Sequence, residues 1–211
     1  MRSQKISLVI VLLASLLGGC ATNGDPGDPL EPLNSGITKF NNTFDAAIAK
    51  PVATGYKAAL PQPVRTGVGN FFSNLDDVIV LLNDLLQFKF GQAASDFGRL
   101  AFNTTLGIAG IFDVATPMQM PKHNEDFGQT LGRWGIGTGP YLVLPFFGPS
   151  DLRDSVGLVV DYRVDPVYQQ DDMAVRNQAV ALRAIHKRSV LLGSEDIVNE
   201  AALDPYIFVR N

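Results

Sequence analysis

Cys20 is the residue whose surroundings most clearly indicate a chemistry. It is the single cysteine of the chain and follows a basic start and an apolar run over residues 8–17. A basic start, a short apolar stretch and small residues before a cleavage site are typical of a secretory signal peptide. Residues 17–20, Leu-Gly-Gly-Cys, resemble a bacterial lipobox, in which the thiol is acylated and the cysteine becomes the first mature residue. We therefore predict a covalent N-acyl and diacylglycerol lipid, palmitate included, on Cys20. The alternative is a free cysteine after an ordinary signal peptide.

The remaining reactive residues do not form a recognisable catalytic centre. The sequence has no Gly-x-Ser-x-Gly motif, and neither His123 nor His186 has a nucleophile signature beside it. The glycines of Gly135-x-Gly-x-Gly139 lead into a proline rather than a helix, so they do not make a phosphate-binding loop. Metal ligands are not clustered either. We predict that the protein is not an enzyme and uses no cofactor or metal, which disfavours a lipid hydrolase.

Charge and composition indicate a membrane rather than a nucleic acid as the partner. The formal net charge is −4, and removal of Arg2 and Lys5 with the signal peptide makes it more negative. We therefore expect no nucleic-acid partner. Apolar residues make up 46% of the chain and charged residues only 18%, against about 25% charged in a typical soluble domain. After residue 19, polar residues interrupt each apolar run before it reaches the ~18 residues of a spanning helix, which favours a protein lying in or against one leaflet.

Apolar residues recur at helical spacing through the first half of the chain. This periodicity predicts helices over residues 34–49, onward to Leu60 after an interruption at Pro51, and then over residues 64–75, 76–90 and 91–105. In the 76–90 helix, apolar side chains cover more than half of the circumference and leave a narrow polar strip. Such a helix is either buried in a large core or in contact with lipid, and the lipid anchor favours lipid.

The second half of the chain begins with a segment rich in glycine, proline and aromatic residues, residues 107–148. It predicts closely packed turns or a mobile flap, with one short helix near residues 125–134. Ser150 is the expected N-cap of a helix that runs toward Tyr162. A last helix, residues 174–192, is expected to present a solvated basic face, and an acidic segment follows it.

These elements predict an all-α fold with little or no β structure. We divide the chain into a lipoprotein signal peptide (1–19), a lipidated tether rich in proline, glycine and aspartate (20–33) and one helical domain (34–211). Without a second cysteine no disulfide can form within the chain, so stability must come from packing or from the bilayer.

Polar and glycine-containing motifs follow one another in a fixed order through residues 28–166. They are Asn34-x-x-x-x-x-Phe40-Asn41, Pro63-Val-Arg65-x-x-x-x-Asn70-Phe-Phe-x-Asn-Leu75, Asn83-Asp-Leu-Leu-Gln87, Arg99-x-x-x-Asn103-Thr-Thr-Leu-Gly107, Gly110-Ile-Phe-Asp-Val-Ala115, Glu125-Asp-Phe-Gly-Gln-Thr-Leu-Gly132, Gly139-Pro-Tyr-Leu-Val-Leu-Pro145, Gly148-Pro-Ser and Arg153-Asp154. Together they closely resemble the MlaA/VacJ family of outer-membrane phospholipid lipoproteins. The chain departs from the family at Ser35, where arginine is usual, and in its short end at Arg210-Asn211.

The resemblance implies a ring-like bundle of amphipathic helices in the inner leaflet of the outer membrane, facing the periplasm and enclosing an amphipathic channel. It implies partners: phospholipids, a trimeric porin and a soluble periplasmic lipid carrier of the MlaC type. Ala21, after the cysteine, fits lipoproteins passed on to the outer membrane. The implied function is removal of mislocalised phospholipids from the outer leaflet, which maintains lipid asymmetry. The alternative is a scaffold that tethers porin or periplasmic partners without transporting lipid.

Six polar residues within or beside strongly apolar segments are candidates to line the implied channel: Asn83, Gln87, Arg99, Asn103, Asp126 and Arg153. For each of them a buried structural hydrogen bond or ion pair is the alternative role. The glycine-rich segment, residues 107–148, is the candidate gating element. Because the chain has no Walker motif, the direction of transport must come from lipid asymmetry or from partner proteins.

Overall fold

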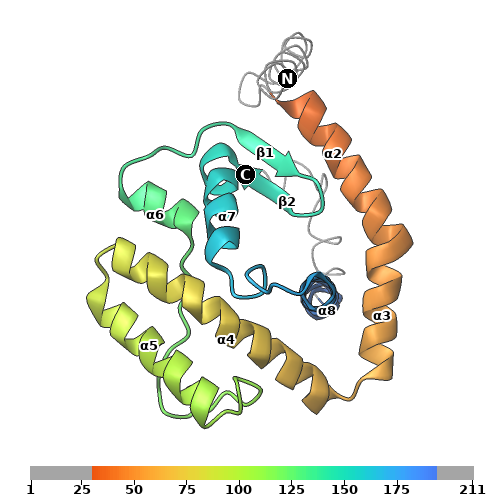
Figure 1. The fold of residues 1–211 in the computed structure, drawn as a ribbon. Helices are drawn as coiled ribbons and strands as arrows, with labels where there is room; N and C mark the ends of the chain where they lie inside the picture. Colours follow the sequence, from red (N-terminus) through yellow and green to blue (C-terminus); the bar gives the residue numbers. More distant parts are fainter. Residues whose placement is uncertain (1–29, 194–211) are drawn as a thin grey trace.

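The computed structural model describes residues 30–193, which form helices and one small β-hairpin (Figure 1). Its elements are α2 (Glu31–Phe44), the π-helical turn η1 (Asp45–Ala49), α3 (Lys50–Ala59), α4 (Gln62–Leu86), α5 (Phe90–Thr105), α6 (Phe127–Arg133), β1 (Tyr141–Leu144), β2 (Gly148–Asp151), α7 (Leu152–Val164) and α8 (Met173–Leu191). The prediction of an all-helical fold with little β structure is confirmed. Cys20, the signal peptide, most of the tether and the acidic segment after α8 lie outside the described residues.

The helices are arranged as a ring around α8 (Figure 1). One side of the ring is the arm formed by α2, η1 and α3, and the other holds α4 and α5, with α6, α7 and the hairpin between them. The ring closes where α2 meets β1. Asn34 donates a hydrogen bond to the carbonyl of Tyr141 at 3.0 Å and accepts one from the backbone N–H of Val143 at 2.9 Å. The Asn34 side chain thus takes the place of a neighbouring strand.

A second asparagine two turns along α2 extends this contact. Asn41 donates to the carbonyl of Leu144 at 3.0 Å and accepts from the backbone N–H of Phe146 at 2.8 Å. Phe146 has a φ of 67°, which is unusual for a residue other than glycine. This hydrogen bond and edge contacts of its ring with Phe40 and Phe44 hold it in place.

The sequence predicted that Pro51 separates two helices, but in the structure the helical arm continues through it. A proline inside a helix lacks an N–H, and its ring collides with the carbonyl four residues earlier. The chain absorbs this in η1, where the turn widens and the backbone N–H of Lys50 bonds to the carbonyl of Asp45, five residues back. The arm therefore continues from Glu31 to Ala59.

The two helices predicted over residues 64–75 and 76–90 are one helix, α4, because no proline or turn residue interrupts the sequence between them. It ends at Leu86, earlier than predicted, because Phe88 has a φ of 61° and turns the chain into α5. The N-cap of α7 is Asp151 rather than Ser150. The Asp151 carboxylate accepts a hydrogen bond from the backbone N–H of Asp154 at 2.8 Å, while Ser150 pairs with Leu142 in the hairpin.

The glycine-rich segment contains tightly packed turns at its start. A side-chain carbon on Gly107 would lie 2.1 Å from the carbonyl oxygen of Phe112, and one on Gly110 would lie 2.4 Å from Cβ of Asn74. Neither position has room for a side chain. Residues 107–112 therefore match the expectation of closely packed turns.

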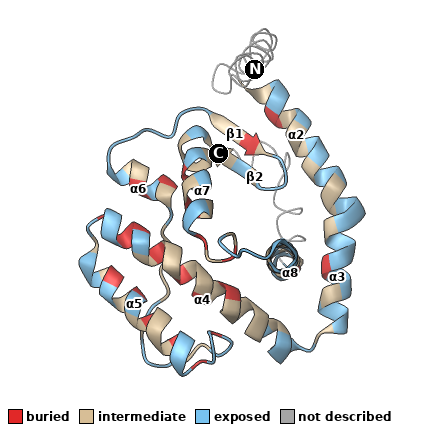
Figure 2. Cartoon of the chain, in the orientation of Figure 1, coloured by how far each residue is buried: buried red, intermediate tan, exposed pale blue. Residues whose placement is uncertain are grey.

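The buried residues of the fold are mostly polar, whereas many large apolar side chains are exposed. Polar residues outnumber apolar ones among the buried residues of the described chain, and the largest side chains buried almost completely are asparagine, aspartate and threonine. Many leucines, phenylalanines and valines are exposed instead, including Phe88 at 74% and Ile108 at 62%. The buried positions concentrate on α4, α5, α6 and α7, while α2 and α3 have one each (Figure 2).

Helix α4 shows this inversion within a single turn. Asn83 and Asp84 are 2% and 0% exposed, whereas the neighbouring Leu82, Leu85 and Leu86 are 39–44% exposed. Burial in a large core, one of the two alternatives for this helix, does not hold for these leucines, because they are exposed while the polar strip faces the protein. Their contact with lipid, the other alternative, stays a prediction. No helix among residues 30–193 is both long and apolar enough to cross a bilayer.

Candidate functional site

The centre of the molecule contains an interior network, which we define as Asn83, Gln87, Glu125, Thr130 and Asp161. Thr130 on α6 donates to Oδ1 of Asn83 at 2.7 Å and accepts from Gln87 at 3.1 Å. Asn83 donates in turn to Asp161 on α7 at 3.1 Å. The other Asp161 oxygen accepts the backbone N–H of Phe127 at 3.0 Å. Burial nevertheless raises the pKa of Asp161. The network ties α4, α6 and α7 together.

Glu125 is the acidic end of the interior network. Its carboxylate accepts hydrogen bonds from Gln87 at 3.0 Å, from Gln92 at 3.0 Å and from Lys89, with which it also forms an ion pair, at 2.6 Å. Burial raises the pKa of Glu125, but these hydrogen bonds outweigh burial, so the net shift is downward. Glu125 is therefore a firmly ionised carboxylate.

A second group, the Arg99 cluster, consists of Arg99, Asn103, Asp113 and Thr116. Arg99 on α5 is 3% exposed and donates to the carbonyl of Met120 at 2.5 Å, to Thr116 at 3.2 Å and to both Asp113 oxygens at 3.3–3.4 Å. Asn103 accepts two further backbone N–H groups, of residues 114 and 115, at 2.9 and 3.0 Å. The cluster fixes this part of the glycine-rich segment to α5.

Between these two groups lies a carboxyl pair, Asp84 on α4 and Asp96 on α5, each 0% exposed. His123 approaches both Asp96 oxygens at 2.9 and 3.0 Å, whereas neither oxygen of Asp84 has a hydrogen-bond donor among the described groups. Burial and the adjacent Asp96 carboxyl raise the pKa of Asp84 to about 7. Two carboxylates cannot hydrogen-bond to each other, so a proton held by Asp84 satisfies the pair.

The six predicted channel residues occupy two kinds of environment. Asn83, Gln87, Arg99 and Asn103 are buried in the interior network and the Arg99 cluster, with the partners given above. Asp126 is exposed and caps α6, accepting the backbone N–H of Gln129 at 2.7 Å. Arg153 on α7 pairs with Asp154 at 2.8 Å. The structure thus brings four of the six into the interior, and a channel-lining role for any of them stays a prediction.

Helix α8 presents the expected solvated basic face only at Lys187, which is exposed, whereas Arg183 and Arg188 are paired with carboxylates. Arg183 forms ion pairs with Asp76 and, at 2.6 Å, with Asp165, and Arg188 makes two hydrogen bonds to Asp45 at 2.5 and 2.8 Å. These carboxylates come from α4, from the end of α7 and from η1. Because α8 lies inside the ring, its arginines meet acidic partners on three sides.

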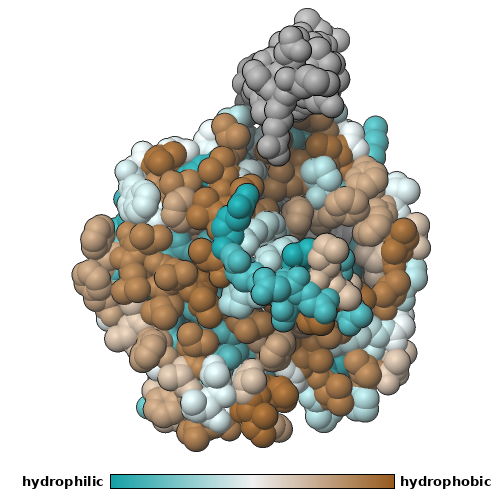
Figure 3. All heavy atoms as spheres, viewed as in Figure 1, coloured by the Kyte–Doolittle hydropathy of each residue, from teal (hydrophilic) through white to brown (hydrophobic). Residues whose placement is uncertain are grey.

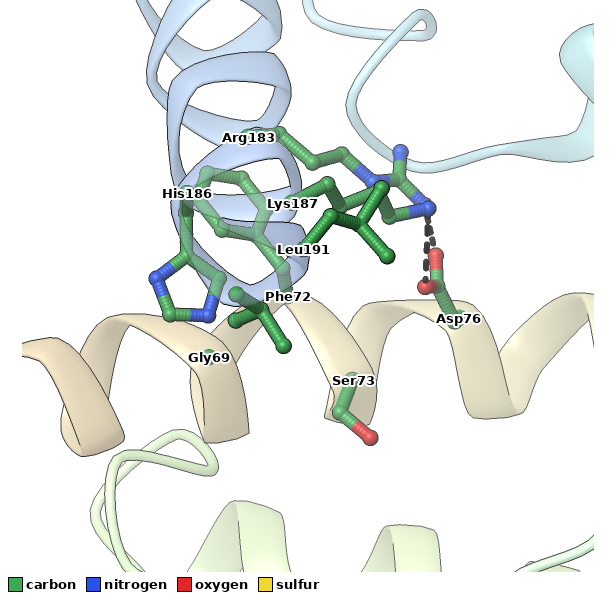
Figure 4. Close-up of a pocket in the computed structure, with 9 residues that line it drawn as sticks. Gly69, Phe72, Ser73, Asp76, Arg183, His186, Lys187 and Leu191 are labelled. Atoms are coloured by element: carbon green, nitrogen blue, oxygen red, sulfur yellow. Dashed lines mark ion pairs between the residues drawn. The ribbon is translucent and has the colours of Figure 1, made fainter. Parts of the chain in front are cut away.

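A pocket of about 380 Å³ opens where α8 crosses α4. Phe72, Val190 and Leu191 provide apolar lining, and Asp76, Arg183, His186 and Lys187 provide polar groups (Figure 4). A second pocket of about 370 Å³ adjoins it, shares Gly69, His186 and Val190, and adds Lys57 and Arg65. We call the two together the α8 junction. His186 packs closely on Gly69, since a side-chain carbon there would lie 2.6 Å from Nε2 of His186 and would displace its ring.

Hydrophilic residues gather at the centre of one face of the molecule, over α8 and the segment leading into it, and hydrophobic residues surround them (Figure 3). Among residues 30–193, no three histidine, cysteine, aspartate or glutamate side chains are grouped so as to hold a metal ion. The buried polar side chains can accommodate polar groups of a ligand, and the exposed apolar side chains can accommodate apolar groups.

Sequence reasoning missed several residues of this interior. Asn34, Thr130, Asp96 and Asp161 were not among the candidates, although each is buried and hydrogen-bonded. Asn34 and Thr130 do lie within the motifs that carry the family resemblance, and this was the available signal. Arg65 and Phe72 of the α8 junction also lie within such a motif, but nothing in the sequence indicated that they meet α8.

Comparisons with known proteins agree on one family. The family model described as MlaA lipoprotein matches residues 26–211. The intermembrane phospholipid transport system lipoprotein MlaA of Escherichia coli K12 is 37% identical over 209 residues, covering 95% of this chain and 82% of the relative. An uncharacterised protein of Rickettsia conorii is 35% identical over 199 residues, covering 92% and 78%.

A solved structure, described as "Structural basis for maintenance of bacterial outer membrane lipid asymmetry", shares the fold. It superposes with a TM-score of 0.76 at 33% identity and covers 87% of this chain and 93% of its own. The family model, the relatives and the shared fold lead to one conclusion: the chain belongs to the MlaA lipoprotein family.

Proposed function

We propose that this protein removes mislocalised phospholipids from the outer leaflet of the outer membrane through an amphipathic passage and delivers them to a periplasmic carrier. The observation that carries the proposal is the inverted distribution of polarity, with hydrogen-bonded polar side chains inside and leucine and phenylalanine side chains outside. Family membership supports it, because the E. coli relative is a phospholipid transport lipoprotein.

The physical reason is the cost of moving a lipid headgroup through hydrocarbon. For an isolated ion this cost is on the order of tens of kcal/mol. A passage with polar walls removes most of that barrier, while the acyl chains remain among apolar groups. The exposed side chains of α4 would insert favourably into lipid, since burying one leucine side chain stabilises by about 1.5–3 kcal/mol.

Anchoring and partners complete the proposal. A lipid on Cys20 would hold the chain at the inner leaflet of the outer membrane, facing the periplasm, through the tether predicted over residues 20–33, of which residues 31–33 belong to α2. A trimeric porin and a soluble carrier of the MlaC type are the proposed protein partners, as the family resemblance implies. A Cys20→Ser variant is expected to lose lipid modification, which intact-mass measurement detects.

The opposing candidate is a scaffold that tethers porin or carrier without moving lipid. It requires no bound lipid and no polar passage.

An enzymatic role has no support in the geometry, because neither His123 nor His186 pairs with a nucleophile: His123 contacts the Asp96 carboxylate and His186 the Tyr56 hydroxyl. Release of fatty acid by the purified protein would overturn the proposal that it is not an enzyme.

The deciding experiment joins two measurements. Native mass spectrometry of gently extracted protein reports co-purifying phospholipid, and outer-leaflet phospholipid is quantified in cells with and without the gene. Bound phospholipid together with surface accumulation on deletion supports transport. The absence of both signals, with porin still bound, establishes the scaffold instead.

The proposed gating element also needs its own test. The Arg99 cluster fixes residues 113–116, so movement is expected in the later part of the glycine-rich segment, around Gly135 and Gly139, whose φ angles are 91° and 75°. Limited proteolysis should cut there in a lipid-dependent manner. Equal protection in every lipid condition would contradict a gate.

A further inference from the structure

The α8 junction combines an excess of positive charge with exposed apolar side chains. Its lining includes four cationic residues, Lys57, Arg65, Arg183 and Lys187, against one carboxylate, Asp76. We propose that the α8 junction binds the phosphate of an anionic phospholipid, with an acyl chain lying along Phe72, Val190 and Leu191. This inference rests on the transport function proposed above and specifies its headgroup class.

The cations differ in how far they are neutralised. Arg183 is 12% exposed and paired with both Asp76 and Asp165, so its charge is already compensated. The side chain of Lys187 is 63% exposed and lies 3.8 Å from Asp76, a carboxylate that Arg183 already occupies. Lys57 and Arg65 form no ion pair with any other described residue. Three cations from three helices are thus available to an incoming anion.

The electrostatics of neighbouring groups agree with a positive junction. Burial lowers the pKa of His186, and the charge of Arg65 lowers it further. Burial and the charge of Arg183 likewise lower the pKa of Lys187, and the Asp165 carboxylate offsets part of this shift. An anion bound between these groups would relieve their mutual repulsion. His186 itself hydrogen-bonds to Tyr56 at 3.2 Å and, as a neutral ring, contributes a polar wall rather than charge.

The apolar side distinguishes a lipid from free phosphate. Val190 and Leu191 are 64% and 56% exposed, one turn beyond the cationic residues of α8. Phe72 on α4 is itself buried and lines the same pocket (Figure 4). A phosphate alone would leave Val190 and Leu191 exposed, whereas an acyl chain would cover them. A zwitterionic choline headgroup would bring a positive charge toward three cations, so an anionic glycerol headgroup fits better.

The test compares soluble probes on the full-length, detergent-solubilised protein by titration calorimetry. The probes are dihexanoyl-phosphatidylglycerol, dihexanoyl-phosphatidylcholine and inorganic phosphate. We expect the phosphatidylglycerol to bind at least about tenfold more tightly than either other probe, the size of one charge-assisted hydrogen bond. Lys187→Glu should remove that preference. Lys39→Glu makes the same charge change on an exposed position of α2 and should leave it intact.

Each alternative result has a definite meaning. Equal binding of the two lipids, unchanged by Lys187→Glu, overturns the inference, although phospholipid co-purifying with the wild-type protein would leave the transport function standing. Inorganic phosphate binding as tightly as phosphatidylglycerol overturns a lipid site in favour of a phosphate site. If wild-type protein neither co-purifies with phospholipid nor binds any lipid probe, the proposed function itself fails.

Discussion

The interior network and the α8 junction both place polar side chains between helices, but they differ in how those side chains are satisfied. In the interior network the amide and hydroxyl groups of Asn83, Gln87 and Thr130 have partners within the fold. In the α8 junction Lys57 and Arg65 have no carboxylate partner among the described residues, and Lys187 shares Asp76 with Arg183, beside exposed apolar groups. Satisfied polar groups hold helices together, whereas unsatisfied charges next to a pocket are suited to a ligand.

The largest loss of stability is expected in the Arg99 cluster, whose polar groups, like those of the interior network, have partners within the fold. Arg99→Ala leaves the Asp113 carboxylate, Thr116 and the Met120 carbonyl without their donor. Removing one partner of a buried ion pair costs about 3–5 kcal/mol, so we expect urea unfolding in detergent to show a loss near the lower end, since Asp113 is partly exposed. A variant that folds with unchanged stability but no longer transports lipid would show that Arg99 lines the channel instead.

The contact between α6 and α7 should be nearly as sensitive. A side-chain carbon on Gly157 would lie 2.3 Å from the backbone nitrogen of Gly128, and backbone cannot yield as a flexible side chain can. Gly157→Ala is expected to destabilise by about 1–3 kcal/mol through overpacking. In Gly55→Ala the new carbon meets nothing within 4 Å on α3, so a gain of about 0.5–1 kcal/mol is expected. Equal effects of the two would contradict the tight helix contact.

The carboxyl pair gives an intermediate, pH-dependent effect. The folded pKa of Asp84, about 7, lies above its ordinary value of 3.8, so between these values the folded state binds more protons than the unfolded chain. Stability should therefore fall as pH rises from about 4 to 7 and level off above that range. Asp96 and Glu125 on the facing elements raise this pKa, and His123 lowers it.

In Asp84→Asn, a side-chain amide N–H replaces the carboxyl proton of Asp84 as the hydrogen-bond donor to Asp96. The variant should lose the part of this pH dependence that Asp84 contributes, while the raised pKa values of Asp77, Asp161 and Asp165 maintain the rest. It should become more stable than the wild-type protein at pH 8, on the order of 2 kcal/mol. Asp171→Asn, the same chemical change at an exposed position before α8, is the control for a simple change in net charge. A wild-type profile that is flat between pH 4 and 7 would show that the pair does not hold a proton.

The sequence predicted the positions of those helices whose ends depend on local residue patterns. Apolar spacing placed α5 and α8 within one residue of their observed ends, and α6 within two residues. The merging of two predicted helices into α4 and the passage through Pro51 were missed, because periodicity shows faces and not the continuity of a backbone. Asn34 could not be assigned, since its partners Tyr141 and Val143 lie more than a hundred residues away.

The basic face of α8 shows the same limit. Its arginines were interpreted as solvated from the clustering of basic residues along the helix. Asp45, Asp76 and Asp165 reach them only when the ring forms. The fold class and family were thus accessible from sequence, whereas the division of α8 into compensated and available cations required the three-dimensional arrangement.

That division makes the smallest predicted effect the most informative. Arg183 and Lys187 lie one turn apart on α8, yet Arg183 is buried between two carboxylates and Lys187 is largely exposed. Lys187→Ala should change the free energy of unfolding by at most about 0.5 kcal/mol, as for exposed ion pairs, while Arg183→Ala should unfold the protein at clearly lower urea. Because Lys187 contributes so little to stability, its charge is available for binding. A large loss of stability in Lys187→Ala would instead make it part of the same structural pairing as Arg183, and the α8 junction would then resemble the interior network.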